Sequence, residues 1–594
     1  MSSVMPETLP LPVDDAGRRD AELLRTLSWN SEPKRLAAAS KSGDVPMFAR
    51  ETRRELRRRF GTKGVDANRL AARYPLHESL AAASSMRVAD PGGEMPFESF
   101  EKTSKLIRLA ALLDGLRLGG SRMSDEALWP LWSEAWLCSS EMCESAVSDE
   151  SPLVQILIAE ATLASGILFD GAEGMRSRRK LGRTRLIAEL EARTDTDGTP
   201  HADLLPLLPA WFASVARCAH WARGGRLRLW NAEYSGRFDG LVRAVATLTG
   251  PDGRIALAET ADVRPALAEA LKCAGWKRGS AVGDLVNRLK KADADAVRKA
   301  SERPSVPHKI DKSSPPVVQS DWAKLVVSRS RWRPNADLLA IAHHVAVPSI
   351  EFVALGHRIF SGEWGLSVRL DGEALPLTGE CDAVSWFSDK DADYVELQWT
   401  TEPGIVICRQ ALLTRGDHQF FVADSISAPG RPEARIETEM TLPLATAVVG
   451  ESLRPGRELR LNGNGLSVRC LPIALPMDRI DRGTGSFEPD ARRLVMKQSG
   501  IGGIYAPLLF DWHPHRRDVQ VDWRNLTVTE NGQKVRPDAA VGCRARLGKR
   551  QLLVYRNLNG SKAKRAVLGH HHDHETVIGR FTNTGEVDPL VYVE

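Results

Sequence analysis

The chain is poor in the features that mark several large classes of protein. Its 594 residues include eight cysteines, but no two form a CxxC pair, so neither a disulfide framework nor a zinc ribbon is indicated. No stretch approaches the roughly 20 consecutive apolar residues that a membrane-spanning helix needs. The first residues, MSSVMPETLPLPVDDAGRRD, carry acids and prolines where a secretory signal would carry a basic cluster and an apolar run. We therefore predict a cytoplasmic protein with reduced thiols and no membrane association.

Signatures of nucleotide and nucleic-acid binding are also missing. Neither GxxxxGK[ST] nor GxGxxG occurs, and the net charge is only +5. Arginine gathers in two segments, residues 53–59 and 176–185, without interleaved aromatic residues. This pattern is typical of solvated helix faces and does not favour nucleic acid as a partner. The second segment includes Arg183 and Arg185, which would attract an acidic polymer and are our candidate substrate-binding arginines.

The first 300 residues show the apolar spacing of helices. A chain this long exceeds the roughly 250 to 300 residues that one core can serve, so we expect two domains. Apolar residues recur at intervals of three and four in TSKLIRLAALLDGLRLGG and in SPLVQILIAEATLASGILF, which opens with Ser151 as cap and Pro152 in its first turn. Further helices are expected near 46–60, 66–85, 175–194, 207–223, 236–249 and 262–302. Such a succession predicts an α/α bundle that curls into a toroid.

The rest of the chain has a different pattern. Residues 301–321 combine prolines, serines and charges, which predicts a linker. Residues 322–594 carry short alternating apolar runs and hairpin dipeptides such as Asn531-Gly532. With many strands and almost no helical spacing, this part is predicted to be an antiparallel β-sandwich of two large sheets. The predicted fold class is therefore α+β multidomain, with a helical α/α-toroid over 1–300 followed by a C-terminal antiparallel β-sandwich.

The order of these halves, and four of their segments, resemble the heparinase II/III-like polysaccharide lyases. SPLVQILIAEATLASGILF and ELEARTDTDGTPHADLLPLLPAW are similar to two toroid helices of that family, the second introduced by the Asp197-Gly198 turn. IAHHVAVPSIEFVALGHRIFSGEW resembles the first sandwich strands, and RQALLTRGDHQFFVADSIS resembles a strand pair that ends in Val422-Ala423-Asp424. The similarity covers residues 100–430 in outline.

The resemblance implies β-elimination on a uronic-acid-containing polysaccharide. One residue neutralises the C6 carboxylate, a base removes the C5 proton, and an acid protonates the leaving oxygen; no cofactor is required. In the family an Asn or Glu beside a His neutralises the carboxylate, and a Tyr about ten residues beyond the Asp-Gly turn serves as acid or base. Here residues 150–155 contain no Asn-His pair, Leu207-Leu208 stands in place of the Tyr, and the sandwich lacks a His-x-His-x-Asp.

Other residues are candidates for these roles. His201 follows the Asp-Gly turn at a predicted helix start and is our candidate base, although an exposed first-turn histidine would show the same pattern. Tyr234 is the candidate acid, and Trp230 is the candidate for stacking on a sugar ring, with packing as the alternative role of both. His343 and His344 would point to opposite faces of a strand, so one of them at most would reach a cleft.

Two further groups of histidines invite a metal-binding interpretation. His513 and His515 flank a proline that favours extended backbone, so both imidazoles could reach one divalent ion, although no third ligand follows from the spacing. The run His570-His571-His572-Asp573-His574 fits a polar turn between strands, where adventitious binding of nickel or zinc is the expectation.

Three functions fit these observations. The first is a lyase that acts on an acidic polysaccharide or oligosaccharide, and the second is a catalytically inactive member of the same fold that binds carbohydrate or a protein. The third is a hydrolase with paired carboxylates, for which Asp195, Asp197 and Glu233 are the acids. Histidine and tyrosine side chains that converge in one cleft would favour a lyase. A cleft filled by apolar side chains would favour the inactive binding protein, and two carboxylates that face each other across the cleft would favour the hydrolase.

Overall fold

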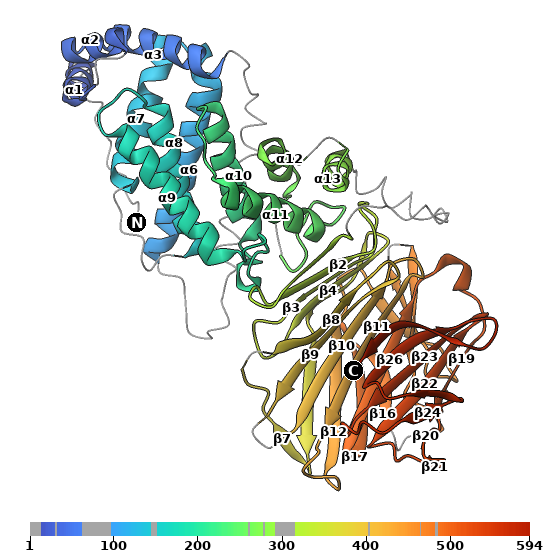
Figure 1. Cartoon of the computed structure of the whole chain (residues 1–594). Coiled ribbons are helices and arrows are strands. Elements are labelled where there is room, and N and C mark those ends of the chain that lie inside the picture. The colour runs from blue at the N-terminus through green and yellow to red at the C-terminus, as the bar shows by residue number, and fades with distance from the viewer. Residues whose placement is uncertain are drawn as a thin grey trace, which may run out of the picture. The chain divides into compact units, whose positions relative to one another are not determined.

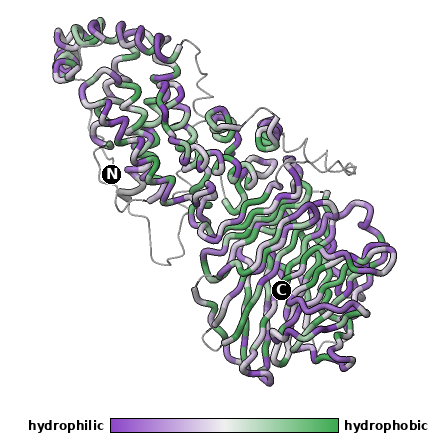
Figure 2. Tube along the Cα trace, viewed as in Figure 1, coloured by the Kyte–Doolittle hydropathy of each residue, from purple (hydrophilic) through white to green (hydrophobic). Residues whose placement is uncertain are grey.

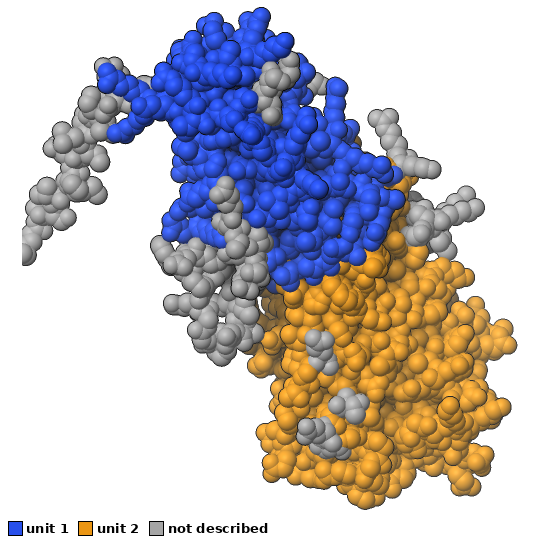
Figure 3. Space-filling view, turned by 60° about the vertical axis from the view of Figure 1, so that its left-hand side comes forward, with its two compact units in different colours: residues 1–193, 206–238, 260–275 blue, residues 194–205, 239–259, 276–594 orange. Residues whose placement is uncertain are grey.

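The computed structural model describes residues 13–29, 33–61, 97–143, 151–258, 262–276, 279–291, 315–379, 381–401, 404–463, 465–480 and 485–594. It divides into two compact units, which are described separately (Figures 1 and 3). Unit 1 comprises residues 1–193, 206–238 and 260–275, and unit 2 comprises residues 194–205, 239–259 and 276–594. The predicted helix at 66–85 and most of the predicted linker lie outside the described residues.

Unit 1 is built from helices. They are α1 (Val13–Thr26), α2 (Lys34–Ser42), α3 (Val45–Phe60), α6 (Phe97–Gly119), α7 (Asp125–Cys143), α8 (Pro152–Leu168), α9 (Met175–Arg193), α10 (Leu208–Gly224) and α12 (Arg264–Cys273). The division between the units falls within α11 (Ala232–Leu248). The single helix predicted over 262–302 is wrong, because the chain forms α12 and then, in unit 2, the separate α13 (Ala281–Lys291). None of the described helices is both long and apolar enough to cross a membrane.

Helix α8 is the centre of unit 1. Ser151 Oγ accepts a hydrogen bond from Val154 N at 3.4 Å, and Pro152 occupies the first turn, as predicted. From Leu153 to the end of the helix every residue except Gln155 is buried. A helix buried all round must be enclosed by others, and α6, α7, α9 and α10 pack against it.

Two contacts fix the neighbours of α8. Gly182 of α9 faces Leu163 so closely that a Cβ atom there would lie 2.5 Å from the Leu163 backbone nitrogen. The glycine therefore lets the two helices approach each other. A buried ion pair joins α8 to α10, with Arg217 Nε 2.6 Å from Glu160 Oε1. Because both charges are almost wholly buried, each depends on the other for its hydrogen bonds.

Unit 2 consists mainly of antiparallel sheets. The first sheet has β1 (Val317–Ser320), β2 (Leu325–Arg329), β3 (Leu338–Ala342), β4 (Ser349–Ala354) and β5 (His357–Glu363) in sequence order. The eight-stranded sheet has the order β13 (Val449–Ser452), β14 (Leu459–Gly463), β15 (Leu466–Pro472), β18 (Gly503–Asp511), β11 (Gln419–Ser427), β10 (Val406–Thr414), β9 (Ala392–Thr400) and β8 (Asp382–Ser388). The third sheet has the order β16 (Gly485–Asp490), β17 (Arg493–Ile501), β12 (Arg435–Pro443), β6 (Gly365–Leu370) and β7 (Glu373–Leu375).

The C-terminal part of unit 2 forms two smaller sheets. One has the order β19 (Val521–Leu526), β22 (Ala540–Leu547), β23 (Arg550–Asn557), β26 (Thr576–Phe581) and β27 (Val587–Val593). The other has the order β21 (Gln533–Lys534), β20 (Val528–Glu530), β24 (Arg565–Val567) and β25 (His570–His572). The antiparallel β-sandwich predicted for the second half of the chain is confirmed, and with it the α+β fold class.

The main core of unit 2 lies between the large sheets. Hydrophobic residues follow the strands in Figure 2, and the buried aromatic rings of Phe352, Phe360, Phe420 and Phe510 pack on one another at centroid distances of 4.6 to 6.5 Å. Such ring pairs add to the stabilisation that burial of their area already provides.

Asp424, which closes the segment that resembles a family strand pair, has a structural role here. Arg409 of β10 donates from Nε to Asp424 Oδ1 at 2.8 Å, and both side chains are about 1 % exposed. The Arg409 guanidinium also lies 4.1 Å from the ring centroid of Trp364 and donates to the Trp364 carbonyl. The carboxylate therefore neutralises a buried arginine in the core of the sandwich.

Candidate active site

The loop over residues 194–205 is a tight turn that leads to His201. Asp195 N donates to Thr199 O at 2.8 Å, and Asp197 Oδ1 accepts from Thr199 N at 2.8 Å. Gly198 has a φ of 89°, a conformation that glycine adopts without strain. Gly240 of α11 faces this turn so closely that a Cβ atom would lie 1.7 Å from Asp197 O. Only a glycine fits there, so the helix and the turn fix each other.

A second segment is bonded to this loop. Ser320 Oγ donates to Asp195 Oδ2 at 2.5 Å and also accepts a hydrogen bond from Ala323 N at 3.0 Å. Ala202 N donates to Ala323 O at 2.8 Å. These bonds hold residues 320–323, which connect β1 to β2, beside the loop. They place Trp322, which is 46 % exposed, beside His201.

His201 stands at the centre of the resulting cluster. Its Nδ1 lies 2.7 Å from Asp203 Oδ1, and its side chain is 25 % exposed. The Trp322 ring lies 5.2 Å from the imidazole, edge to face, and the His344 ring lies 6.3 Å away. Asp203 N also points at Nδ1, at a distance of 3.3 Å. We assign the Nδ1 proton to the shorter contact, the one with the Asp203 carboxylate, so that Nε2 carries the lone pair. His201 then has the form of a general base.

The two consecutive histidines come from the end of β3 and have different surroundings. Leu325 of β2 pairs with Ala342 of β3, so the residue before β2 and the residues after β3 meet at one end of the sheet. His343 is 1 % exposed, and its Nδ1 lies 3.0 Å from the Cys381 carbonyl oxygen. Burial lowers the pKa of His343, which keeps this imidazole neutral. His344 is half-buried and lies beside His201.

Lys324 adds a cation to the same end of the sheet. Its carbonyl oxygen accepts a hydrogen bond from His343 N at 2.9 Å, so the residue immediately precedes β2 where β3 ends. Its Nζ lies 3.0 Å from Asp382 Oδ1, whose side chain is 79 % exposed. A pair with so exposed a carboxylate is weak.

Two predicted aromatic site residues belong to unit 1 and contact other partners. The Tyr234 hydroxyl donates to Glu191 of α9, and this hydrogen bond raises the pKa of the tyrosine. Trp230 stacks on Phe238 with a centroid distance of 5.4 Å. Tyr234 thus makes a hydrogen bond at the surface and Trp230 makes a stacking contact, whereas the structure groups His201 with His344 and Trp322.

The two predicted substrate-binding arginines lie on α9. Arg185 Nη1 donates to Cys143 O at 2.9 Å and to Thr162 Oγ1 at 3.1 Å, so it joins α9 to α7 and α8. Arg183 is half-buried on the same helix. Of the acids of the hydrolase hypothesis, Asp197 accepts a hydrogen bond within the turn and Asp195 accepts one from Ser320. Glu233 is exposed in the first turn of α11.

The predicted metal ligands lie in unit 2 after β18. The rings of His513 and His515 are 5.5 Å apart, and His513 Nδ1 accepts a hydrogen bond from His515 N at 3.2 Å. Burial lowers the pKa of His513 to about 4. Across the part of the chain that the structure describes, no group of three histidine, cysteine, aspartate or glutamate side chains is arranged to hold a metal ion. A divalent ion at His513 and His515 stays a prediction.

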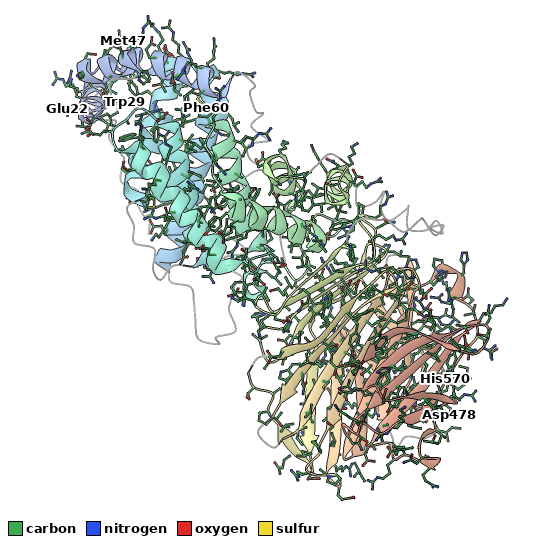
Figure 4. All side chains as sticks on the ribbon, viewed as in Figure 1. Glu22, Trp29, Met47, Phe60, Asp478 and His570 are labelled. Carbon is green, nitrogen blue, oxygen red and sulfur yellow. The ribbon has the colours of Figure 1, made fainter. Side chains whose placement is uncertain are left out.

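The histidine run at 570–574 forms a strand where we expected a turn. His570 to His572 make up β25 at the edge of the small sheet, and His570 is labelled in Figure 4. The strand forms because these residues pair with Arg565 to Val567 of β24. The His572 ring packs 4.1 Å from the Tyr555 ring, and burial lowers its pKa to about 4.

Sequence reasoning missed Trp322 and Lys324. Both lie directly after the predicted linker, where no periodic pattern drew attention to them. The sequence Asp-Trp-Ala-Lys directly before an apolar run could have indicated them as site residues. An aromatic and a cationic residue that lie outside a strand do not pack into the core of the sheet.

Comparison with known proteins identifies the fold. No family model and no curated protein matches the sequence. Among solved structures, a heparinase III (BT4657 gene product) has a TM-score of 0.54 at 11 % identity, covering 94 % of this chain and 93 % of that chain. The heparan sulfate lyase HepC from Pedobacter heparinus has a TM-score of 0.53 at 12 % identity, covering 96 % of this chain and 92 % of that chain. Another heparinase III has a TM-score of 0.52 at 10 % identity, with coverage of 97 % and 93 %.

These similarities extend over nearly the whole of each chain. The fold is therefore that of the heparinase III type of polysaccharide lyase, a helical toroid followed by a β-sandwich, and the resemblance seen in the sequence is confirmed at the level of the fold. At 10 to 12 % identity the similarity establishes the fold alone.

Proposed function

We propose that this protein binds uronic-acid-containing glycans at the His201 cluster and cleaves them by β-elimination. One observation supports this most directly: His201, bonded to Asp203, lies beside His344 and the exposed Trp322, on a fold shared with heparan sulfate lyases. A base, a second imidazole and an aromatic surface are the groups that such a reaction uses.

His201 is the proposed base. Its Nε2 takes the proton from C5 of the uronate, the electron pair of that bond forms the C4–C5 double bond, and the C4–O bond breaks. The Asp203 carboxylate 2.7 Å from Nδ1 supports this role, because it fixes the tautomer and stabilises the imidazolium that forms. Asp203 is therefore a positioning residue.

His344 and Lys324 are proposed to handle the charges. The departing oxygen needs a proton, and the uronate carboxylate needs a neutralising partner as negative charge develops. His344, whose ring centroid lies 6.3 Å from that of His201, is the candidate to supply this proton. Lys324, whose carboxylate partner is largely exposed, is the candidate to neutralise the uronate.

Trp322 is the proposed sugar platform. Exposed aromatic rings stack against the apolar face of a sugar ring, and an indole held in one orientation binds with little loss of side-chain entropy. The bonds of Ser320 and Ala323 to the His201 loop fix the backbone on both sides of Trp322. This role replaces the stacking predicted for Trp230, which instead packs on Phe238.

The test is the appearance of a 4,5-unsaturated uronate, followed by its ultraviolet absorbance, with heparan, chondroitin, alginate and pectin-like substrates. We expect His201→Ala to lower the rate by roughly 10²- to 10⁴-fold, the range for removal of a general base. Trp322→Ala should mainly raise KM, because a platform binds the ground state and the transition state alike. Lys549→Ala is the control, an exposed residue of the same unit that should leave the rate unchanged.

A specific observation favours a second function, glycan binding without cleavage. Leu207-Leu208 stands where the family tyrosine is expected, and these two buried leucines have no group that could exchange a proton. Binding that Trp322→Ala weakens, with no unsaturated product from any substrate, would establish this second function and refute the lyase proposal. Product formation that is unaffected by His201→Ala would refute the assignment of the base.

A further inference from the structure

A hollow in unit 2 lies over the edge of the eight-stranded sheet. It has a volume of about 480 Å³ and is lined by Glu451, Arg460, Asn462, Ser467 and Arg517, among others. This volume lies within the roughly 300 to 1,000 Å³ of pockets that hold small ligands. Its lining carries no aromatic residue, so a ligand would be recognised there by hydrogen bonds and charge.

The floor of this hollow follows from the strand register. Glu451 of β13 pairs with Arg460 of β14, and Asn462 pairs with Ser467 of β15. Residues two apart on a strand share a face, so Arg460 and Asn462 stand side by side. Asn462 Nδ2 donates to Glu451 Oε2 at 3.4 Å. Three neighbouring strands thus present hydrogen-bond donors and acceptors on one face.

The wall is held in place by a buried arginine. Arg469 of β15 is 5 % exposed and donates from Nη1 to Arg516 O at 3.0 Å and to Val519 O at 2.6 Å. Arg460 Nη2 donates to Arg517 O at 3.1 Å. The segment 516–519 is therefore fixed over the strand face, with the Arg517 side chain exposed at the rim.

Both arginines have capacity for a ligand. Within the described residues, Arg460 Nε is buried and has no hydrogen-bond partner. Its nearest carboxylate is Asp518 Oδ1, 3.9 Å from Nη1, on a side chain that is 83 % exposed. Such a pair contributes little in water, so an anionic ligand is able to displace the aspartate. A buried guanidinium nitrogen without a hydrogen-bond acceptor is energetically unfavourable, and a ligand that supplies an acceptor would relieve this cost.

We propose that this hollow is a binding site for an acidic saccharide unit, separate from the His201 cluster. Arg460 and Arg517 take the carboxylate or sulfate group, because guanidinium groups bind such anions with directed hydrogen bonds. Asn462, Ser467 and Glu451 bind the hydroxyl groups of the sugar ring. The site has no group placed for catalysis, and its role is to retain an acidic glycan on the β-sandwich.

The test uses hydrogen exchange of the full chain with a glucuronate-containing tetrasaccharide and with a neutral tetrasaccharide of the same length. We expect protection of the peptides that cover 449–469 and 514–519 with the acidic probe alone. Arg460→Met and Arg517→Met should each weaken this protection at least tenfold in the concentration of probe required. Arg493→Met, an arginine that is 56 % exposed on β17, is the matched control and should change nothing.

The two sites are distinguished by location and by readout. Protection of the peptides covering 194–205 measures binding at the His201 cluster, and unsaturated product measures the proposed reaction. If neither is observed, binding at the hollow can still be tested. Arg517 is exposed, so Arg517→Met should fold normally even if Arg460→Met does not. Equal protection by the neutral probe, no protection at 449–469, or protection that survives both arginine substitutions would each overturn the proposal.

Discussion

Glu189 of α9 should make the stability of unit 1 depend on pH. Its side chain is 3 % exposed, and within the described residues neither carboxylate oxygen has a hydrogen-bond partner. Arg193 Nε lies 3.9 Å from Oε2 and offsets only part of the cost of burial. Burial therefore raises the pKa of Glu189 from 4.5 to about 7.

The sign and size of this pH dependence follow from the difference between the pKa of Glu189 in the folded protein and its pKa in the unfolded chain. The folded protein holds the Glu189 proton up to about pH 7, whereas the unfolded chain releases it near 4.5. The contribution of the protonated group to stability is fully present below pH 4.5 and is lost as the pH rises to 7. A pKa difference of about 2.5, at about 1.4 kcal/mol for each pH unit, corresponds to a loss of up to about 3 kcal/mol.

Urea unfolding of the wild-type chain and of Glu189→Gln at pH 4.5, 6 and 8 measures this loss. Glutamine has nearly the shape of a protonated glutamate, so the two proteins should be about equally stable at pH 4.5. At pH 8 the variant should be more stable by up to about 3 kcal/mol. Glu191→Gln is the control, since this carboxylate lies on the exposed side of the same helix.

A difference between Glu189→Gln and wild type that stays constant from pH 4.5 to 8 would refute the reasoning. It would mean that Glu189 is ionised in the folded state, stabilised by Arg193 or by solvent. If Glu191→Gln differed from wild type by the same pH-dependent amount, the effect would come from the removal of a negative charge from α9 and not from the burial of Glu189.

Three further outcomes are expected. Gly240→Ala places a Cβ 1.7 Å from Asp197 O, so it should lower the thermal unfolding temperature and disturb exchange in the His201 loop. Arg409→Met leaves the buried Asp424 carboxylate without its partner and should cost about 3 to 5 kcal/mol in urea unfolding. Because burial lowers the pKa of His572 to about 4, its contribution to stability is present above about pH 6.5 and is lost toward pH 4. Unfolding of His572→Gln at pH 7 and pH 4.5 should therefore show a smaller acid loss than wild type.

The helices that sequence predicted best are those with local signals. α8 has a serine cap, a proline in its first turn and a continuous apolar sequence, and all three act within a few residues. α7 was missed, because Pro130 lies inside it and proline ordinarily marks a boundary. The break between α12 and α13 was missed because the sequence contains only weak punctuation, whereas the chain turns at Gly279 with a φ of 78°.

The candidate site was predictable only in part. His201 could be chosen because the Asp-Gly turn that precedes it is a local pattern, and His344 because it follows an apolar strand. Their proximity depends on the pairing of β2 with β3 and on the hydrogen bonds between residues 194–205 and 320–323. The hydrogen bonds between 194–205 and 320–323 join residues more than 100 positions apart, and composition or periodicity does not encode them.

The residues that hold the site are distinct from those that would react in it. Asp195, Gly198 and Gly240 form and seat the turn through backbone hydrogen bonds and close packing, and none of these contacts uses the Nε2 of His201. The fold can therefore keep its geometry when a reacting residue changes. Retention of the fold gives no measure of activity, which has to be tested at the two imidazoles. If the protein is a lyase, His201→Ala and His344→Ala should each lower the rate of product formation by roughly 10²- to 10⁴-fold without a change in unfolding temperature.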